Sequence, residues 1–439
     1  MMRSMFSGVS GLRVHQTKMD VIGNNIANVN TTAFKSGRVT FNEVFSQTLQ
    51  GASGPSEYTG RGGINPMQVG LGVNVSSIDT LMTSGAAQRT DNPFDLMIEG
   101  DGFFVVGDES GTYFTRAGIF RKDDSGNLVI PNGMKVYGWD TVETDEDTGV
   151  QTVVRGNVAP LKLDTPENLV AEPEATTRIN IQGNLNLVDG EEGITIQVQF
   201  YDTLGNLFSG NLQATYDASS GEWTIQAIDE DGNAGSDMYI VSSDGEIETT
   251  ITGLSDLNIT FDSSGNPVYP SGVDELIFQI PEGDLQNSSG TTISKIGPIE
   301  ISFDDITQYN STTSIDPIRV DGREVGTLQG YSIGSDGIIT ASYSNGDTKV
   351  LGQIVVANFI NPAGLEKVGD NLYATTPNSG DFDGIGEEGT LQGGVLEMSN
   401  VDLSYEFTEM ITTQRGFQAN SRIITVSDEM LQELVNLKR

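Results

Sequence analysis

Apolar residues recur at helical spacing at the two ends of the chain, and not in the long segment between them. No proline occurs between Ser4 and Val29, and apolar residues there stand seven apart, at Met5, Leu12, Met19 and Ile26. The same interval recurs near the other end, at Leu403, Met410, Phe417, Ile424 and Leu431. A repeat of seven is typical of a coiled coil or a packed helical bundle. We therefore predict one helix in residues 1–30 and another in residues 398–439.

Further apolar residues widen both stripes, and polar residues suit the ends of the second helix. Val9 and Ile22 flank the first stripe; the second is flanked by Phe407, Ile411, Ile423, Leu434 and Val435. Asp402 and Ser404 are suited to cap the second helix, and Lys438 and Arg439 favour the negative end of its dipole.

Two interpretations of the stripes remain open: amphipathic helices that cover a β core, or helices that pair with each other and with further copies of the chain. Coiled-coil spacing and the balanced charge of both ends favour the second. We expect the assembly interface to contain Met5, Val9, Leu12, Met19, Ile22, Ile26, Leu403, Phe407, Met410, Phe417, Ile424 and Leu431.

The segment between the helices alternates in polarity as β-strands do. Asp101-Gly102 stands between Asp95–Glu99 and Phe103–Val106 and predicts a hairpin, as Asn132-Gly133 does further on. The 53 glycines among 439 residues indicate many tight turns. The Gly-rich residues 31–75 are expected to form an extended connector.

Prolines divide this β region. Pro160, Pro166 and Pro173 precede a block of cleanly alternating strands, and Pro298 and Pro317 follow it. We predict a mixed, mainly β fold with one β domain inserted in another, and terminal helices that pair as a coiled-coil-like domain. The expected domains are 1–30 with 398–439, helical; 31–75, the connector; 76–160 with 310–397, the first β domain; and 161–309, the inserted β domain.

The net charge of −38 is concentrated in the middle of the chain. Residues 1–50 carry five basic and two acidic side chains and residues 395–439 carry four and seven, so the two ends together are neutral. An acidic surface repels phosphate groups, which argues against nucleic acid and anionic membranes as partners. The absence of Cys excludes disulfides. No apolar run is long enough for a membrane anchor, and the first residues lack the apolar core of a secretory signal peptide.

No group of residues has the spacing of a catalytic, cofactor-binding or metal site, so we expect a protein without enzymatic activity. His15 is the single histidine and lies in the first predicted helix. The sequences Asp229–Asn233 and Asp262–Asn266 faintly resemble acidic ion-binding loops but lack their ligand spacing, and are expected to be turns between strands. The glycine clusters lack the setting of a phosphate-binding loop.

Both ends carry motifs beyond periodicity. Ser10–Leu12 and Met19–Lys35, with Ser399–Leu403 and Met410–Asn420, resemble the two end signatures of the flagellar rod and hook axial proteins. Ala33 departs mildly from the pattern, because the resemblance leads us to expect glycine there in many relatives. The motif residues that we single out are Asn24, Asn25, Asn28, Asn30, Phe34, Lys35, Gln414, Arg415 and Asn420.

Segments of the β region resemble the hook members of this family. They are Gly100–Val105, Phe114–Gly118, Gly138-Trp139, Phe200–Asn206, Tyr331–Gly337 and Ile354–Phe359. The resemblance implies a structural subunit that self-assembles into a flexible, tubular universal joint outside the cell and transmits torque from the rod to the filament. It places the terminal helices at the central channel, the first β domain in the wall and the inserted one outside.

The resemblance also implies partners and a route of export. The partners would be many copies of the chain, the flagellar rod, the hook–filament junction proteins, the hook cap and the type III export apparatus, which takes chains without a cleaved signal peptide. One alternative is a distal rod protein, which would share the end motifs but lack an inserted domain. The other is a secreted β-rich adhesin or binding protein, which would leave the paired heptads unexplained.

Overall fold

The computed structural model describes residues 2–55, 60–108, 111–145, 150–243, 248–269, 275–286, 292–380 and 390–437. Lys438 and Arg439 lie outside this part of the chain. The chain divides into two compact units. The first unit comprises Met1–Thr165, Tyr331–Thr340 and Val350–Arg439, and the second comprises Pro166–Gly330 and Ala341–Lys349.

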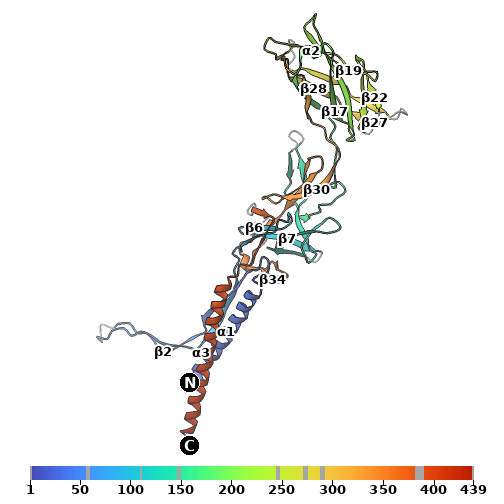
Figure 1. The fold of residues 1–439 in the computed structure, drawn as a ribbon. Helices are drawn as coiled ribbons and strands as arrows, with labels where there is room; N and C mark the ends of the chain where they lie inside the picture. The colour runs from blue at the N-terminus through green and yellow to red at the C-terminus, as the bar shows by residue number, and fades with distance from the viewer. Residues whose placement is uncertain are drawn as a thin grey trace. The chain divides into compact units, whose positions relative to one another are not determined.

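Two long helices of the first unit lie side by side, as predicted. They are α1, Met2–Ala27, and α3, Leu403–Asn436 (Figure 1). They run antiparallel, because Ser4 lies beside Ser427 and Asn25 beside Glu406. Asp402 caps α3 by accepting hydrogen bonds from the backbone N–H groups of Ser404 and Tyr405, at 2.8 and 3.2 Å. Ser404 was also expected as a cap and instead stands inside the first turn of the helix.

The segment expected as an extended connector folds back on itself as a two-stranded ribbon. Strand β1, Gly37–Glu43, pairs with β4, Val73–Thr80, and β2, Ser46–Gln50, pairs with β3, Met67–Gly70. Both pairs are antiparallel. The ribbon contacts α1 through β1 and β4.

The β part of the first unit surrounds strand β7. That strand, Phe103–Asp108, pairs with β8, Gly111–Thr115, with β11, Lys135–Trp139, and with β33, Val356–Ala357. Outside them lie β9, Arg121–Lys122; β10, Leu128–Val129; β14, Ala159–Pro160; β34, Glu366–Gly369; β35, Leu372–Ala374; and the paired β12, Val142–Thr144, and β13, Gln151–Val153. Strands β30, Gly326–Ile333, β31, Ile338–Tyr343, and β32, Thr348–Ile354, supply residues to both units. Aromatic rings of Phe103, Phe114 and Phe359 meet edge to face in the core.

One of the two predicted hairpins is correct and the other is wrong. Asn132-Gly133 joins β10 to β11, which are paired. Strand β6, Leu96–Glu99, pairs with β36, Thr390–Gly393, and not with β7. A two-residue type I′ turn needs positive φ at both central residues. Here Gly100 and Gly102 have positive φ, of 96° and 140°, whereas Asp101 between them does not, so the strands diverge. Strand β5, Ala87–Arg89, likewise pairs with a strand far away in the sequence, β37, Val395–Glu397.

The second unit contains one four-stranded and one eight-stranded sheet around a common apolar core. The first sheet consists of β16, Arg178–Asn184; β25, Ile277–Ile280; β28, Ile299–Thr307; and β29, Ser314–Val320. The second consists of β17, Ile194–Tyr201; β18, Leu207–Asp217; β19, Glu222–Ile228; β20, Ala234–Gly235; β21, Met238–Ser242; β22, Glu248–Ile251; β23, Leu257–Phe261; and β24, Pro267–Val268. The remaining elements are α2, Leu187–Gly190, β15, Val170–Ala171, and the hairpin of β26, Gly283–Gln286, and β27, Thr292–Ile296.

One five-residue turn, Asp-x-x-Gly-Asn, recurs in both units and includes the two sequences that resembled ion loops. In the second unit, Asp229 and Asp262 each accept a hydrogen bond from the backbone N–H of the Asn four residues on. Asp123 makes the same contact with Asn127 in the first unit. The glycine of each turn has φ between 81° and 84°, which only glycine adopts without strain. These sequences are therefore turns between strands, as predicted.

Candidate assembly interface and the junction of the helix pair

The buried residues of α1 and α3 are mostly glycines and polar residues. The buried residues of α1 are Gly8, Gly11, Val14, Ile22 and Asn25. Those of α3 are Glu406, Thr413 and Ser427, which are polar although they are spaced by multiples of seven. The heptad pattern thus gives the spacing of the contact, but the fully buried positions of α3 are polar, and the heptad residue Ile424 packs beside them against Gly8.

Glycines let the helix pair, as we call α1 and α3, approach closely. A Cβ atom added to Gly11 would lie 2.7 Å from the side-chain amide of Asn420. On α3, a Cβ at Gly416 would lie 2.7 Å from the ring of His15. Real Cβ atoms do not come this close to neighbours, so a larger residue at either position would have to displace the Asn420 or His15 side chain or separate the helices.

Polar groups fix the register of the helix pair. Asn25 Nδ2 donates to Glu406 Oε1 at 3.0 Å, and Lys18 forms an ion pair with Glu409. Burial raises the pKa of the Glu406 carboxyl, although the hydrogen bond from Asn25 opposes this. A slip of one helical turn would break these contacts, so they favour a single alignment.

The predicted interface residues differ in how much of them is covered inside the chain. Ile22 is buried, with 4% of its surface exposed. Eight are partly covered: Met5, Leu12, Met19, Ile26, Met410, Phe417, Ile424 and Leu431. Val9, Leu403 and Phe407 are 47%, 39% and 50% exposed. The apolar stripe is therefore only partly used inside the chain.

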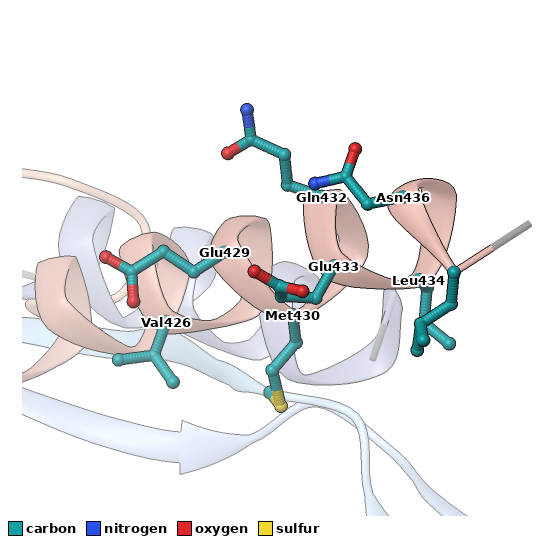
Figure 2. A pocket seen from close by; sticks show the side chains of 8 residues that line it. Val426, Glu429, Met430, Gln432, Glu433, Leu434 and Asn436 are labelled. Carbon is teal, nitrogen blue, oxygen red and sulfur yellow. The ribbon is translucent and has the colours of Figure 1, made fainter. Parts of the chain in front are cut away.

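Two residues that the heptad pattern did not indicate, Val426 and Met430, add exposed apolar surface near the end of α3. They lie beside Leu434, and Figure 2 shows the three side chains on the same side of the helix. Gln432 and Asn436 point to the opposite side. Each of the three apolar side chains is almost half exposed. A spacing of four residues is the signal that could have found them, because it places side chains on one helix face.

Some motif residues act inside the chain and others lie on its surface. Asn25 exchanges two hydrogen bonds with the backbone of Gly37, both 2.9 Å long, and so ties α1 to β1. Asn420 is packed against Gly11, and Asn28 closes the turn after α1 by bonding Asn24 and Thr31. The exposed motif residues are Asn24, Asn30, Gln414 and Arg415.

The motif residue Lys35 belongs to a buried cluster of three charges with Arg116 and Glu397, which we call the junction cluster. Lys35 Nζ lies 2.6 Å from Glu397 Oε1, and both side chains are fully buried. Arg116 Nη1 lies 3.9 Å from the same oxygen, and Arg116 Nε donates to the carbonyl of Gly102. Burial lowers the pKa of the Lys35 ammonium, and the hydrogen bond to Glu397 offsets part of that effect.

The chain segments around the junction cluster are also fixed by hydrogen bonds. Asn400 Oδ1 accepts from the N–H of Ser36 at 2.8 Å, and its Nδ2 donates to the carbonyl of Leu81 at 2.9 Å. The N–H of Ala33 donates to the carbonyl of Glu397, and Ala33 has a φ of 56°. Glycine adopts such a backbone with less strain than alanine, which agrees with the glycine that the family resemblance leads us to expect here.

Four family profiles match the chain. They are described as flagella basal body rod protein, at residues 5–35; flagellar hook protein FlgE/F/G D1 domain, at 97–197; flagellar basal body protein FlaE D2 domain, at 190–323; and flagellar basal body rod FlgEFG protein C-terminal, at 392–437.

Three relatives decide the family. The flagellar hook protein FlgE of Borreliella burgdorferi and that of Treponema pallidum are each 37% identical to the chain, over the whole of both sequences. That of Escherichia coli is 32% identical over 98% of each chain. The chain belongs to the flagellar hook protein family.

Its role follows from the family. The chain is a structural, non-enzymatic subunit of the flagellar hook, located outside the cell and assembled within the flagellum. The mainly β fold with paired terminal helices is confirmed as well.

The described residues contain no group of three or more His, Asp or Glu placed to hold a metal ion. None of their helices is long and apolar enough to cross a membrane. The ring of His15, on α1, lies close to Gly416 of α3 and edge to face with Phe41 of β1.

Proposed function

We propose that neighbouring hook subunits join through the apolar surface that the helix pair leaves exposed. The observation that carries this proposal is the division of side chains on α3. Its contact with α1 is centred on Glu406, Thr413 and Ser427, whereas Phe407, Met430 and Leu434 face outwards. Exposed apolar residues at regular spacing along a helix are typical of a surface that binds another protein.

The length of α3 supports the same proposal. Ser4, near the start of α1, lies beside Ser427, so the last turns of α3 extend beyond α1 (Figure 1). In these turns Met430 and Leu434 remain almost half exposed, and Val426 lies one turn before them on the same side of α3. A helix from another copy would cover them, and burying the exposed half of each side chain would contribute on the order of 1 kcal/mol to assembly.

The finer role that the family suggests is part of the proposal. Polymerised subunits would form a flexible tube that transmits torque from the rod to the filament, with the rod, the hook–filament junction proteins, the hook cap and the type III export apparatus as further partners. The helical domain, residues 1–30 with 398–439, would supply the assembly contacts. The domain of residues 76–160 with 310–397 would form the wall, and residues 161–309 the outer surface.

A pair of variants on opposite sides of α3 tests the interface. We expect Met430→Ser to abolish or strongly slow polymerisation of the purified subunit and to leave its thermal unfolding almost unchanged, because the side chain is already half exposed in the monomer. Gln432→Ser, on the other side of the helix, is the matched control. Sedimentation and negative-stain electron microscopy measure polymer formation.

A second pair extends the test to a residue that the heptad pattern predicted. Phe407→Ser should also block polymerisation, and Thr408→Ser beside it should not. Normal polymers from both Met430→Ser and Phe407→Ser would refute the proposed interface.

A further inference from the structure

Short connections lead out of both helices. Residues 28–36 join α1 to strand β1 of the ribbon, and residues 398–402 join α3 to β37. Since the chain belongs to a hook, a twist applied to the helix pair passes to the rest of the first unit through these connections, through the ribbon that contacts α1, and through side chains that bridge the connections. The junction cluster bridges both, because Lys35 lies in the first connection and Glu397 directly precedes the second.

Glu397 Oε1 is a common acceptor for two segments of this junction. It accepts hydrogen bonds from Lys35 Nζ, at 2.6 Å, and from the N–H of Gly85, at 2.8 Å. Lys35 Nζ also donates to the carbonyl of Thr83, at 2.7 Å. Residues 35, 83, 85 and 397 are therefore linked through one carboxylate oxygen and one ammonium group.

Arg116 connects this site to β7. Its guanidinium donates to the carbonyls of Gly100, Gly102 and Met82 and lies over the ring of Phe103, the first residue of β7. The other carboxylate oxygen, Glu397 Oε2, is buried and accepts no hydrogen bond from the described residues. Glu397 thus depends on Lys35 and Arg116 for its charge balance, and their loss would leave an ion buried without a partner.

We propose that Glu397 is a positioning residue that ties the helix pair to the β part of the first unit, so that the two turn together when the hook carries torque. The inference rests on the proposed transmission of torque but not on the proposed subunit interface. By this inference the motif residue Lys35 forms a link inside the chain, because its side chain is fully buried in the junction cluster.

Hydrogen exchange of the full-length monomer provides a first test. In Glu397→Gln the amides of residues 28–36 and 398–402 should exchange faster, while those of β7 stay protected. A loss of protection spread equally over β7 and the connections would overturn the proposal, because it would show general destabilisation only. Unchanged exchange at both connections would overturn it as well.

A thermodynamic cycle tests whether Lys35 and Glu397 act as a pair. Lys35→Met and Glu397→Gln should each lower the melting temperature of the first unit by about 10 °C, and the double variant by clearly less than the sum. Additive losses would overturn the pairing. Lys122→Met is the matched control: it breaks a more exposed pair with Asp164, of 2.7 Å, and should shift melting by less than about 4 °C.

The torsional compliance of assembled hooks tests the consequence for function. Hooks of Glu397→Gln should twist further under the same load, measured by the rotation of a bead on the hook, at normal hook length. Compliance equal to that of wild type and of Lys122→Met would overturn the role in torque. If Glu397→Gln forms no hooks, Lys35→Arg takes its place, because it keeps the charge of Lys35 but changes the geometry of the ion pair. Hooks of Lys35→Arg must then twist further than those of wild type for the proposal to stand. The subunit interface is tested separately, by polymer formation.

Discussion

The core of the second unit and the contact within the helix pair bury opposite kinds of side chain. The core of the second unit contains fully buried aromatic residues, among them Phe200, Phe208, Trp223, Phe278 and Phe303. The helix pair buries mainly glycines and polar side chains and leaves large apolar residues exposed. A domain that encloses its apolar surface is complete as a monomer. The helix pair is not, and this difference suits a subunit that must fold first and assemble afterwards.

The largest effect should come from the core of the second unit. We expect Phe208→Ala to lower its free energy of unfolding by about 3–5 kcal/mol, because a fully buried ring leaves a cavity. The two tryptophans of the chain report on different units, Trp139 on the first and Trp223 on the second. Denaturation followed by fluorescence in a Trp139→Phe background therefore measures the second unit, and the Trp223→Phe background measures the first. Equal destabilisation of both units would contradict the comparison.

The close contact of the helix pair gives a smaller effect of a different kind. Gly11→Leu should separate α1 from Asn420 and cost about 1–3 kcal/mol, since the contact has no room for a side chain. Gly23 is the control in the same helix, because nothing lies within 4 Å of a Cβ added there. Gly23→Leu should be neutral or slightly stabilising through its better helix propensity. Limited proteolysis of both variants measures the helix pair, and equal behaviour would rule out a close-packed contact.

The four described non-glycine residues with positive φ lie in the first unit, at Ala33, Asp91, Asp370 and Asn371. Ala33 is buried beside Glu397, so its strain is held in place by the packing of the junction. Ala33→Gly should raise the stability of the first unit by up to about 1 kcal/mol, as the relief of strain exceeds the entropy of the added glycine. Melting followed by Trp139 fluorescence measures this, and a fall in stability would show that packing of the methyl group outweighs the strain.

The smallest effect concerns a feature that both units share, the Asp-x-x-Gly-Asn turn. Hydrogen bonds, above all that from the backbone N–H of Asn266, lower the pKa of Asp262 below its ordinary value. A carboxyl whose pKa is lower in the folded than in the unfolded state stabilises the folded protein. This stabilisation is complete above the unfolded pKa, near 3.9, and is lost as the pH falls through the folded pKa. Asp262→Asn keeps the acceptor but removes the titration.

We therefore expect Asp262→Asn to reduce slightly the loss of stability of the second unit between pH 5 and pH 2. Trp223 fluorescence during thermal unfolding at each pH measures this. In the first unit, Asp123→Asn should act alike, because the hydrogen bond from the Asn127 side chain lowers the pKa of Asp123. An acid response identical to that of wild type in both variants would contradict the assigned role of the turns.

Features that depend on neighbouring residues could be predicted from the sequence alone. The seven-residue spacing gave both helices, because apolar side chains repeat on one helix face whatever packs against it. The turn at Asn132-Gly133 and the Asp-x-x-Gly-Asn turns follow from local backbone preferences and side-chain hydrogen bonds. The motifs at both ends correctly indicated the family, and the neutral charge of those ends agreed with it.

Only the tertiary structure decided which groups meet. Strand β6 pairs with β36, almost 300 residues away, because Gly100 and Gly102 direct the chain away from a hairpin. The sequence pattern could not show that Glu406 and Thr413 are the buried residues of α3. A hydrophobic pattern identifies only apolar helix faces, whereas helices that approach closely at glycines can also bury polar side chains. Lys35 was found through its motif, but its partner Glu397 lies 362 positions further along the chain. A buried ion pair depends on the distance between two side chains, and folding alone sets that distance.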